Sequence, residues 1–116
     1  MKPLFIKIDQ KIQIANESVF RALGFTDILE GDSLNVLNGT YYQVSVLGMT
    51  IRLEENSWDY EDDFNFILFI QKDHDSSLKT SDDIKEAMMD VVIKLLLVNL
   101  NAKMGIEKEN RLQLIS

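Results

Sequence analysis

The chain contains no cysteine, and its 116 residues include one proline and one histidine. The absence of cysteine excludes disulfides, thiol nucleophiles and thiolate metal sites. The single histidine, His74, is too little for a histidine-rich metal site or a two-histidine relay. The sequence also lacks internal repeats and Pro/Gly/Ser-rich linkers. We therefore expect one domain that spans residues 1–116.

No segment has the composition of a secretory signal or of a membrane span. Lys7 and Asp9 interrupt the apolar N-terminal segment early, whereas a signal peptide needs roughly 7–15 apolar residues. The most apolar stretch, 91–100, contains Lys94 and Asn99 and falls well short of the ~20 residues that cross a bilayer. We therefore expect a cytoplasmic protein without a membrane partner.

The charge is concentrated in one part of the chain. The 19 acidic residues outnumber the 12 basic ones, and the net charge is −7. Residues 54–90 hold twelve acids and three bases, so this region alone carries −9 and the remainder +2. Because binding to phosphate needs Lys and Arg, we expect no direct contact with DNA, RNA or anionic lipid.

Alternating apolar residues or short apolar runs predict strands over much of the chain. Asn38-Gly39 favours a type I′ turn between two of them, and the change of parity at Gly48 requires a bulge or a tight turn. The run 64–70 is apolar on both faces except at Asn65, which is typical of a central strand covered on both sides. The predicted strands are 34–37, 40–47, 49–53, 64–70, and 4–8 with 12–14 as either one interrupted strand or two short ones. Residues 111–116 either add a short terminal strand through Leu112 and Leu114 or are loose.

A short N-terminal helix is predicted between two end signals. Asn16 is the expected N-cap, and Gly24 can adopt the left-handed conformation that ends a helix. Phe20 and Phe25 are spaced for the apolar contact that accompanies such an ending.

A longer helix is predicted from about Asp82 to Lys103, with Thr80 or Ser81 as its cap and Gly105 as its stop. The predicted fold is α+β: an antiparallel sheet of four to six strands packed against a long C-terminal helix, plus a short N-terminal helix at one end. The long helix carries two apolar stripes, so we expect burial on more than one side. The first stripe comprises Ile84, Ala87, Met88, Val91, Leu95 and Val98. The second comprises Met89, Ile93, Leu96, Leu97 and Leu100, and either the sheet covers it or it forms the seam of a homodimer.

The segment 54–63 holds six acids and no base between two predicted strands, so we expect a loop whose ends the sheet holds. Trp58 and Tyr60 within it belong to the residue types enriched at binding hot spots. Either both rings point outward to a partner, or they fold back on the core beside Phe64 or Tyr42. On the first interpretation the carboxylates steer a basic protein partner. The expected partner-binding residues are Glu54, Glu55, Trp58, Asp59, Tyr60, Glu61, Asp62 and Asp63.

The spacing of polar residues argues against catalysis and against a metal or other cofactor. The acids within 59–63 alternate as in a calcium loop, but the sixth and twelfth positions hold Phe64 and Ile70 instead of Gly and Glu. The Asp-x-Lys triplet at 83–85 is spaced as in some metal nucleases, yet an acid in a first helical turn simply complements the helix dipole. His74 is expected to be a solvated loop residue. The expected protein is not an enzyme.

The segments 47–56 and 59–64, which read strand, acidic loop and strand, resemble small acidic immunity proteins of bacterial toxin systems, including contact-dependent growth inhibition. Size, acidity and the absence of cysteine add to the resemblance. It implies a role and not a fold: a cytoplasmic inhibitor that covers the active or target-binding surface of a cognate toxin, often a basic nuclease. A nucleic-acid mimic that acts on a DNA-binding protein, a dimeric secretion-type chaperone and a phage-encoded accessory protein of structural role remain alternatives.

Overall fold

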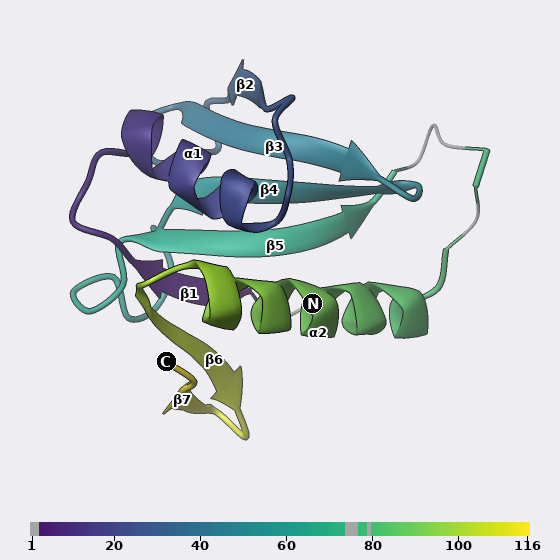
Figure 1. Cartoon of the computed structure of the whole chain (residues 1–116). Helices are drawn as coiled ribbons and strands as arrows, with labels where there is room; N and C mark the ends of the chain where they lie inside the picture. The colour runs from purple at the N-terminus through teal and green to yellow at the C-terminus, as the bar shows by residue number, and fades with distance from the viewer. Residues whose placement is uncertain (1–2, 74–76, 79) are drawn as a thin grey trace.

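The computed structural model describes residues 3–73, 77–78 and 80–116, which form one antiparallel sheet with two helices on the same face (Figure 1). The strands lie in the order β2-β3-β4-β5-β1-β6-β7, and each neighbouring pair is antiparallel. In chain order the elements are β1 (Leu4–Lys7), α1 (Ile12–Ala22), β2 (Leu29–Asp32), β3 (Thr40–Val46), β4 (Met49–Glu55), β5 (Phe66–Lys72), α2 (Asp82–Asn99), β6 (Lys103–Lys108) and β7 (Arg111–Leu114).

The α+β class and the antiparallel sheet are confirmed, but the sheet has seven strands and not four to six. One extra strand, β6, begins at Lys103, where the sequence predicted the end of a helix. Gly105 is not a helix stop but lies within β6 opposite Phe5. A Cβ atom there would lie 3.0 Å from Leu112 and 3.2 Å from Phe64, so the glycine permits close packing. The long helix is therefore not C-terminal, because the chain returns to the sheet as β6 and the expected terminal strand β7.

The hairpin before β3 differs from the prediction, although its turn residues behave as expected. Asn38 and Gly39 have φ angles of 61° and 81°, as a type I′ turn requires, but they end a longer loop from Ser33. The predicted strand 34–37 is wrong; these residues form turns, and the partner strand β2 lies earlier in the chain. At Gly48 the expected tight turn is confirmed, since a two-residue turn joins β3 to β4.

The predicted start of α1 is also wrong. The helix begins at Ile12, so the predicted strand through 12–14 is wrong. Asn16 is not a cap; it is buried inside the helix, and its Nδ2 donates to the carbonyl oxygens of Ile12 and Gln13, each at 2.8 Å. The end of α1 is as predicted: Gly24 has φ of 85°, and the N–H of Phe25 donates to the carbonyl oxygen of Phe20.

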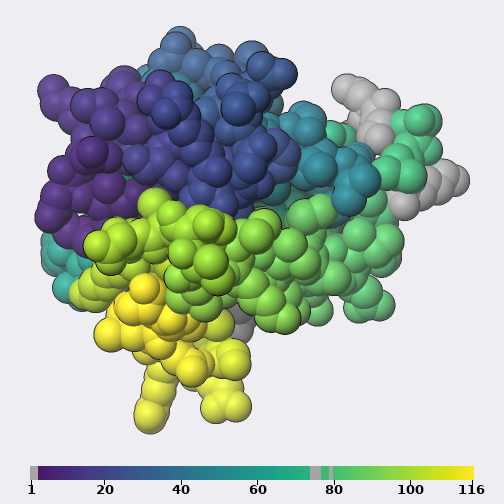
Figure 2. Space-filling model, in the orientation of Figure 1, coloured from purple at the N-terminus to yellow at the C-terminus, as the bar shows by residue number. Residues whose placement is uncertain are grey.

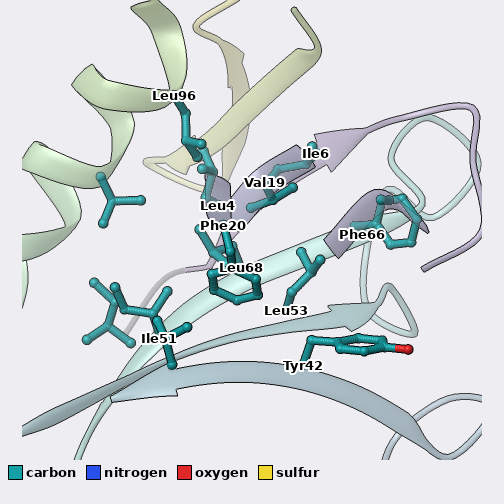
Figure 3. Packing of buried hydrophobic residues seen from close by; sticks show 14 of the residues in the cluster. Leu4, Ile6, Val19, Phe20, Tyr42, Ile51, Leu53, Phe66, Leu68 and Leu96 are labelled. Atoms are coloured by element: carbon teal, nitrogen blue, oxygen red, sulfur yellow. The ribbon is translucent and has the colours of Figure 1, made fainter. Parts of the chain in front are cut away.

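The main core lies between the helices and the sheet (Figure 3). Helix α1 packs on β4 beside α2, which packs on β5, and so α1 shares a face with α2 instead of lying at one end. Within the described residues, neither helix is long and apolar enough to cross a bilayer. The largest fully buried side chains of this core are Phe20, Phe66, Leu4, Ile6, Ile12, Met49, Ile51, Leu53, Leu68 and Ile70.

The chain's own core covers most of the second stripe of α2. Leu96 is fully buried, and three further members pack against the core, so the sheet is what covers them. Only Leu97 of this stripe is exposed. The first stripe is largely uncovered, and Figure 2 shows α2 as an open ridge across the helix face of the molecule. The half-buried members of the second stripe are Met89, Ile93 and Leu100.

A second, smaller core lies on the opposite face of the sheet. Strand β5 is central, and Ile67 is buried on the face that points away from the helices. Phe5 of β1 lies opposite Ile67, and Phe64 packs beside them. The first half of β5 is therefore covered on both faces, as predicted. The cover on this second face comes from the loop that precedes β5.

Candidate functional site

The acidic loop, residues 56–65 between β4 and β5, is held in one conformation by Asn56. This side chain is 4% exposed. Its Nδ2 donates to the carbonyl oxygens of Asp59 (3.0 Å) and Phe64 (2.9 Å), and its Oδ1 accepts from the N–H of Trp58 (2.9 Å). Its own N–H donates to the carbonyl oxygen of Asn65. One buried side chain thus ties the start, the middle and the end of the loop together.

Two aromatic side chains anchor the loop on the sheet. Phe64 is fully buried, 6.0 Å from the ring of Phe5. Tyr60 packs edge-on against the same ring at 5.3 Å, and its hydroxyl donates to Oε2 of Glu107 at 3.2 Å. Partial desolvation and the nearby Glu107 carboxylate raise the pKa of Tyr60. Tyr60 therefore folds back on the sheet, as the second of the two interpretations expects, and it is an anchor of the loop.

Trp58 does the opposite and points outward. Its side chain is 59% exposed, although its backbone N–H is fixed by Asn56. It lines a groove of about 670 Å³, most of which lies on the sheet face away from the helices. Arg52, Ile67 and Phe69 also line this groove, as does Val36 of the loop before β3. The indole is thus an exposed ring on a hydrogen-bonded backbone, and it lines a groove.

The six carboxylates of the segment 54–63 fall into two groups. Glu54 is half-buried and 3.7 Å from Arg52; its burial raises its pKa, an effect that Arg52 partly offsets. Glu55 accepts a hydrogen bond from Nδ2 of Asn38 at 2.9 Å. These two acids belong to the framework of the sheet. The other four are exposed and make no ion pair within the described residues: Asp59, Glu61, Asp62 and Asp63.

Arg52 lines the same groove as Trp58 and contacts two residues of β3, and reasoning from the sequence missed it. Its guanidinium lies 4.0 Å from the centre of the Tyr41 ring and donates to Oε1 of Gln43 at 3.0 Å and 3.1 Å. Tyr41 in turn lies against Gly31, where an added Cβ would overlap the ring. The sequence signal for this cluster is the polar parity of β3 and β4, which assigns these residues to the face opposite the core.

Of the second acidic segment, 73–83, the structure describes 73, 77–78 and 80–83. Asp73 follows the other end of β5, whose seven residues place it roughly 20 Å from the acidic loop. Asp82 lies 3.4 Å from Lys72 and 3.7 Å from Lys85, and the two ammonium groups lower its pKa. Asp73 accepts a hydrogen bond from Thr50. The expected solvated residue His74 and its neighbour Asp75 lie outside the described residues.

Among the residues that the structure describes, no group of three His, Asp or Glu side chains is arranged to hold a metal ion. No family model matches the chain, and neither a curated protein nor a solved structure matches it. The site is therefore described by its own geometry: an exposed indole, and four carboxylates without an ion pair among the described residues, on a loop that Asn56 holds by hydrogen bonds.

Proposed function

We propose that the protein is a non-catalytic immunity or inhibitor protein that neutralises a cognate basic toxin, with the acidic loop as its docking surface. The observation that carries the proposal is the exposure of Trp58 on a loop whose backbone Asn56 holds at Trp58, Asp59 and Phe64. An indole left in water gains no free energy from burial in the fold, and burial on a partner would supply that gain. Trp is also among the residue types most enriched at binding hot spots.

The rigidity of the loop supports a binding role. A flexible loop loses conformational entropy when it docks, at roughly 0.5–1.5 kcal/mol for each ordered side chain. Here Asn56, Tyr60 and Phe64 already fix the backbone around Trp58. Most of the ordering is therefore complete before a partner arrives.

The charge around Trp58 defines the chemistry of the partner. Four exposed carboxylates, none in an ion pair with a residue that the structure describes, attract a surface rich in Lys and Arg and accelerate encounter. A basic nuclease has such a surface where it binds its substrate. The acidic loop would occupy that surface and exclude the nucleic acid.

The test uses the product of the reading frame immediately upstream of the gene for this chain. The wild-type chain should bind it with submicromolar affinity and restore growth of cells that express it. Trp58→Ala should weaken binding by about 2 kcal/mol or more, close to 30-fold in Kd. Calorimetry or surface plasmon resonance gives the affinity, and raising salt should slow association because exposed charges are screened.

Leu114→Ala is the matched control, since Leu114 is as exposed as Trp58 but lies on the edge strand β7. Its affinity should equal that of the wild type. Equal affinity of the Trp58→Ala variant, or no binding of the upstream product at micromolar concentration, would contradict the proposal.

A further inference from the structure

The exposed side of α2 is an apolar stripe that the acidic loop does not explain. Ile84, Val91, Leu95 and Val98 are all exposed large apolar residues, and Val98 is 82% exposed. At about 100° per residue they fall within one narrow sector of the helix, together with Ala87. The stripe is about 21 Å long at 1.5 Å per residue. It lies on the helix face of the molecule, whereas Trp58 lines the groove on the opposite face of the sheet.

A groove continues the stripe toward α1. It has a volume of about 700 Å³ and lies between the C-terminal halves of the two helices. Leu95 and Asn99 of α2 form one side, and Arg21, Leu23 and Gly24 at the end of α1 form the other. The C-terminal end of the stripe therefore adjoins a groove, while Ile84 at its N-terminal end is exposed. When two copies meet head to tail, the exposed Ile84 of one copy can approach the groove of the other.

The charges of α2 favour the same arrangement. Its N-terminal half, 82–90, carries four acids and one lysine, and its C-terminal half, 91–99, carries Lys94 and no acid. Two parallel copies would place the acidic halves against each other. Two antiparallel copies place each acidic half beside the Lys94 of the other and also oppose the two helix dipoles.

The flank of the stripe is self-complementary as well. Asp90 and Lys94 lie on the same flank, one helical turn apart, and neither makes an ion pair within the described residues. In an antiparallel pair centred on Val91, a two-fold axis brings Lys94 of each copy near Asp90 of the other. The same axis sets Ile84 of one copy opposite Val98 of the other, beside the groove.

We propose that this stripe binds a second copy of the chain, and that the protein is an antiparallel homodimer through α2 with Val91 at the two-fold axis. The seam uses Ile84, Val91, Leu95 and Val98, whereas most of the second stripe lies in the core of each copy. The dimer leaves both acidic loops free on the outer faces. It does not depend on the proposed docking of a toxin.

Sedimentation equilibrium tests the dimer. The wild-type chain should have twice the mass of 13.4 kDa at about 100 µM. Val91→Glu should be monomeric, because it opposes two carboxylates at the axis. Leu34→Glu is the control: Leu34 is exposed in the loop before β3, outside both helices, and its variant should remain dimeric. Thermal unfolding of each variant shows whether it is folded.

A charge exchange tests the ion pair between the copies. Lys94→Asp alone and Asp90→Lys alone should each weaken association, whereas the double variant should form the dimer again.

Single cysteines test the orientation, since the chain has none of its own. On oxidation, Ile84→Cys mixed with Val98→Cys should give a mixed disulfide, and Val98→Cys alone should give little cross-linking. Trp58→Ala should leave the dimer intact, so the two proposals fail separately. A wild-type chain that is monomeric at this concentration, a dimeric Val91→Glu variant, or efficient self-linking by Val98→Cys would overturn the inference.

Discussion

At the scale of single residues, the site rests on Asn56 more than on the acids around it. Its amide makes three hydrogen bonds to the loop backbone in a position that water hardly reaches. Replacement by Ala would leave two buried or half-buried carbonyl groups without this donor. The cost of such losses exceeds that of exposed hydrogen bonds, because no water takes the place of the amide.

Asn56→Ala should therefore lower the free energy of unfolding by about 2–3 kcal/mol, near 1 kcal/mol for each hydrogen bond. Urea denaturation measures this change. Asn101, which is exposed just after α2, provides the comparison, and Asn101→Ala should change stability by less than about 0.5 kcal/mol. A similar loss for both variants would mean that Asn56 does not hold the loop.

Tyr42 makes stability depend on pH in the alkaline range. Burial, followed by the hydrogen bond of 2.6 Å to Glu30, raises its pKa to about 12. Figure 3 shows its hydroxyl pointing away from the other labelled core residues. The folded state favours the protonated phenol, so this contribution to stability is complete below pH 10 and is lost as pH rises toward 12.

Thermal unfolding between pH 9 and 12 should show a steeper loss of stability for the wild type than for Tyr42→Phe. The phenylalanine keeps the ring in the core but cannot ionise. Parallel curves for the two proteins would show that the phenol of Tyr42 is not held protonated by the fold.

Residue-level reasoning from the sequence could identify Trp58, Tyr60 and the acids as candidates, but not which of these side chains are exposed and which pack on the sheet. Trp58 and Tyr60 are two positions apart in one loop, yet one is exposed and the other packs on Phe5. The difference comes from the left-handed backbone at Tyr60, with φ of 64°, which no local sequence pattern indicates. The partner of Tyr60, Glu107, is distant in the chain.

At the scale of elements, end signals and periodicity each identified only part of the structure: Asn16 is not a cap, and Gly105 is not a helix stop. Gly24 ends α1 as predicted, whereas the alternation through Ile12 and Ile14 continued a strand pattern into what is a helix. The buried face of α1 uses Ile12, Ala15 and Val19, at helical spacing, and leaves Ile14 exposed. A short apolar run fits both the period of a strand and the period of a helix, and only packing in the core decides which of the two forms.

Gly24 offers a clean test of the helix end. Its φ of 85° is strained for other residues, and an added Cβ would meet nothing within 4 Å. Gly24→Ala should therefore cost about 1 kcal/mol of stability through the backbone alone, and Gly24→Asn should cost less, because asparagine tolerates this conformation. Chemical denaturation of the three proteins checks the order, and an alanine variant as stable as the wild type would contradict it.

The strand β6 shows what local patterns cannot supply. Its residues include Met104, which is buried against the main core, and Gly105, which faces Phe64 and Leu112. These contacts join segments far apart in the chain. The sequence offered a helix-stop signal at the same place, and only the long-range pairing with β1 decides that Gly105 belongs to a strand.

At the scale of the whole molecule, the sheet separates two surfaces of different character. One face carries the helices and the apolar stripe of α2, and the other carries the groove beside the acidic loop. Asp73 lies at the far end of β5 from the acidic loop, and Lys72 and Lys85 form ion pairs with Asp82. The local charge of the acidic loop, more than the total of −7, is therefore what a partner would meet.

The central claim, that Trp58 is the anchor of a partner interface, is open to one direct measurement. Trp58 is the single tryptophan of the chain, so biosynthetic 5-fluorotryptophan gives one ¹⁹F resonance with an unlabelled partner. In the free protein this resonance should show the solvent-isotope shift of an exposed indole. On saturation with the upstream gene product it should move and lose most of that shift, whereas an unchanged resonance in a formed complex would contradict the claim.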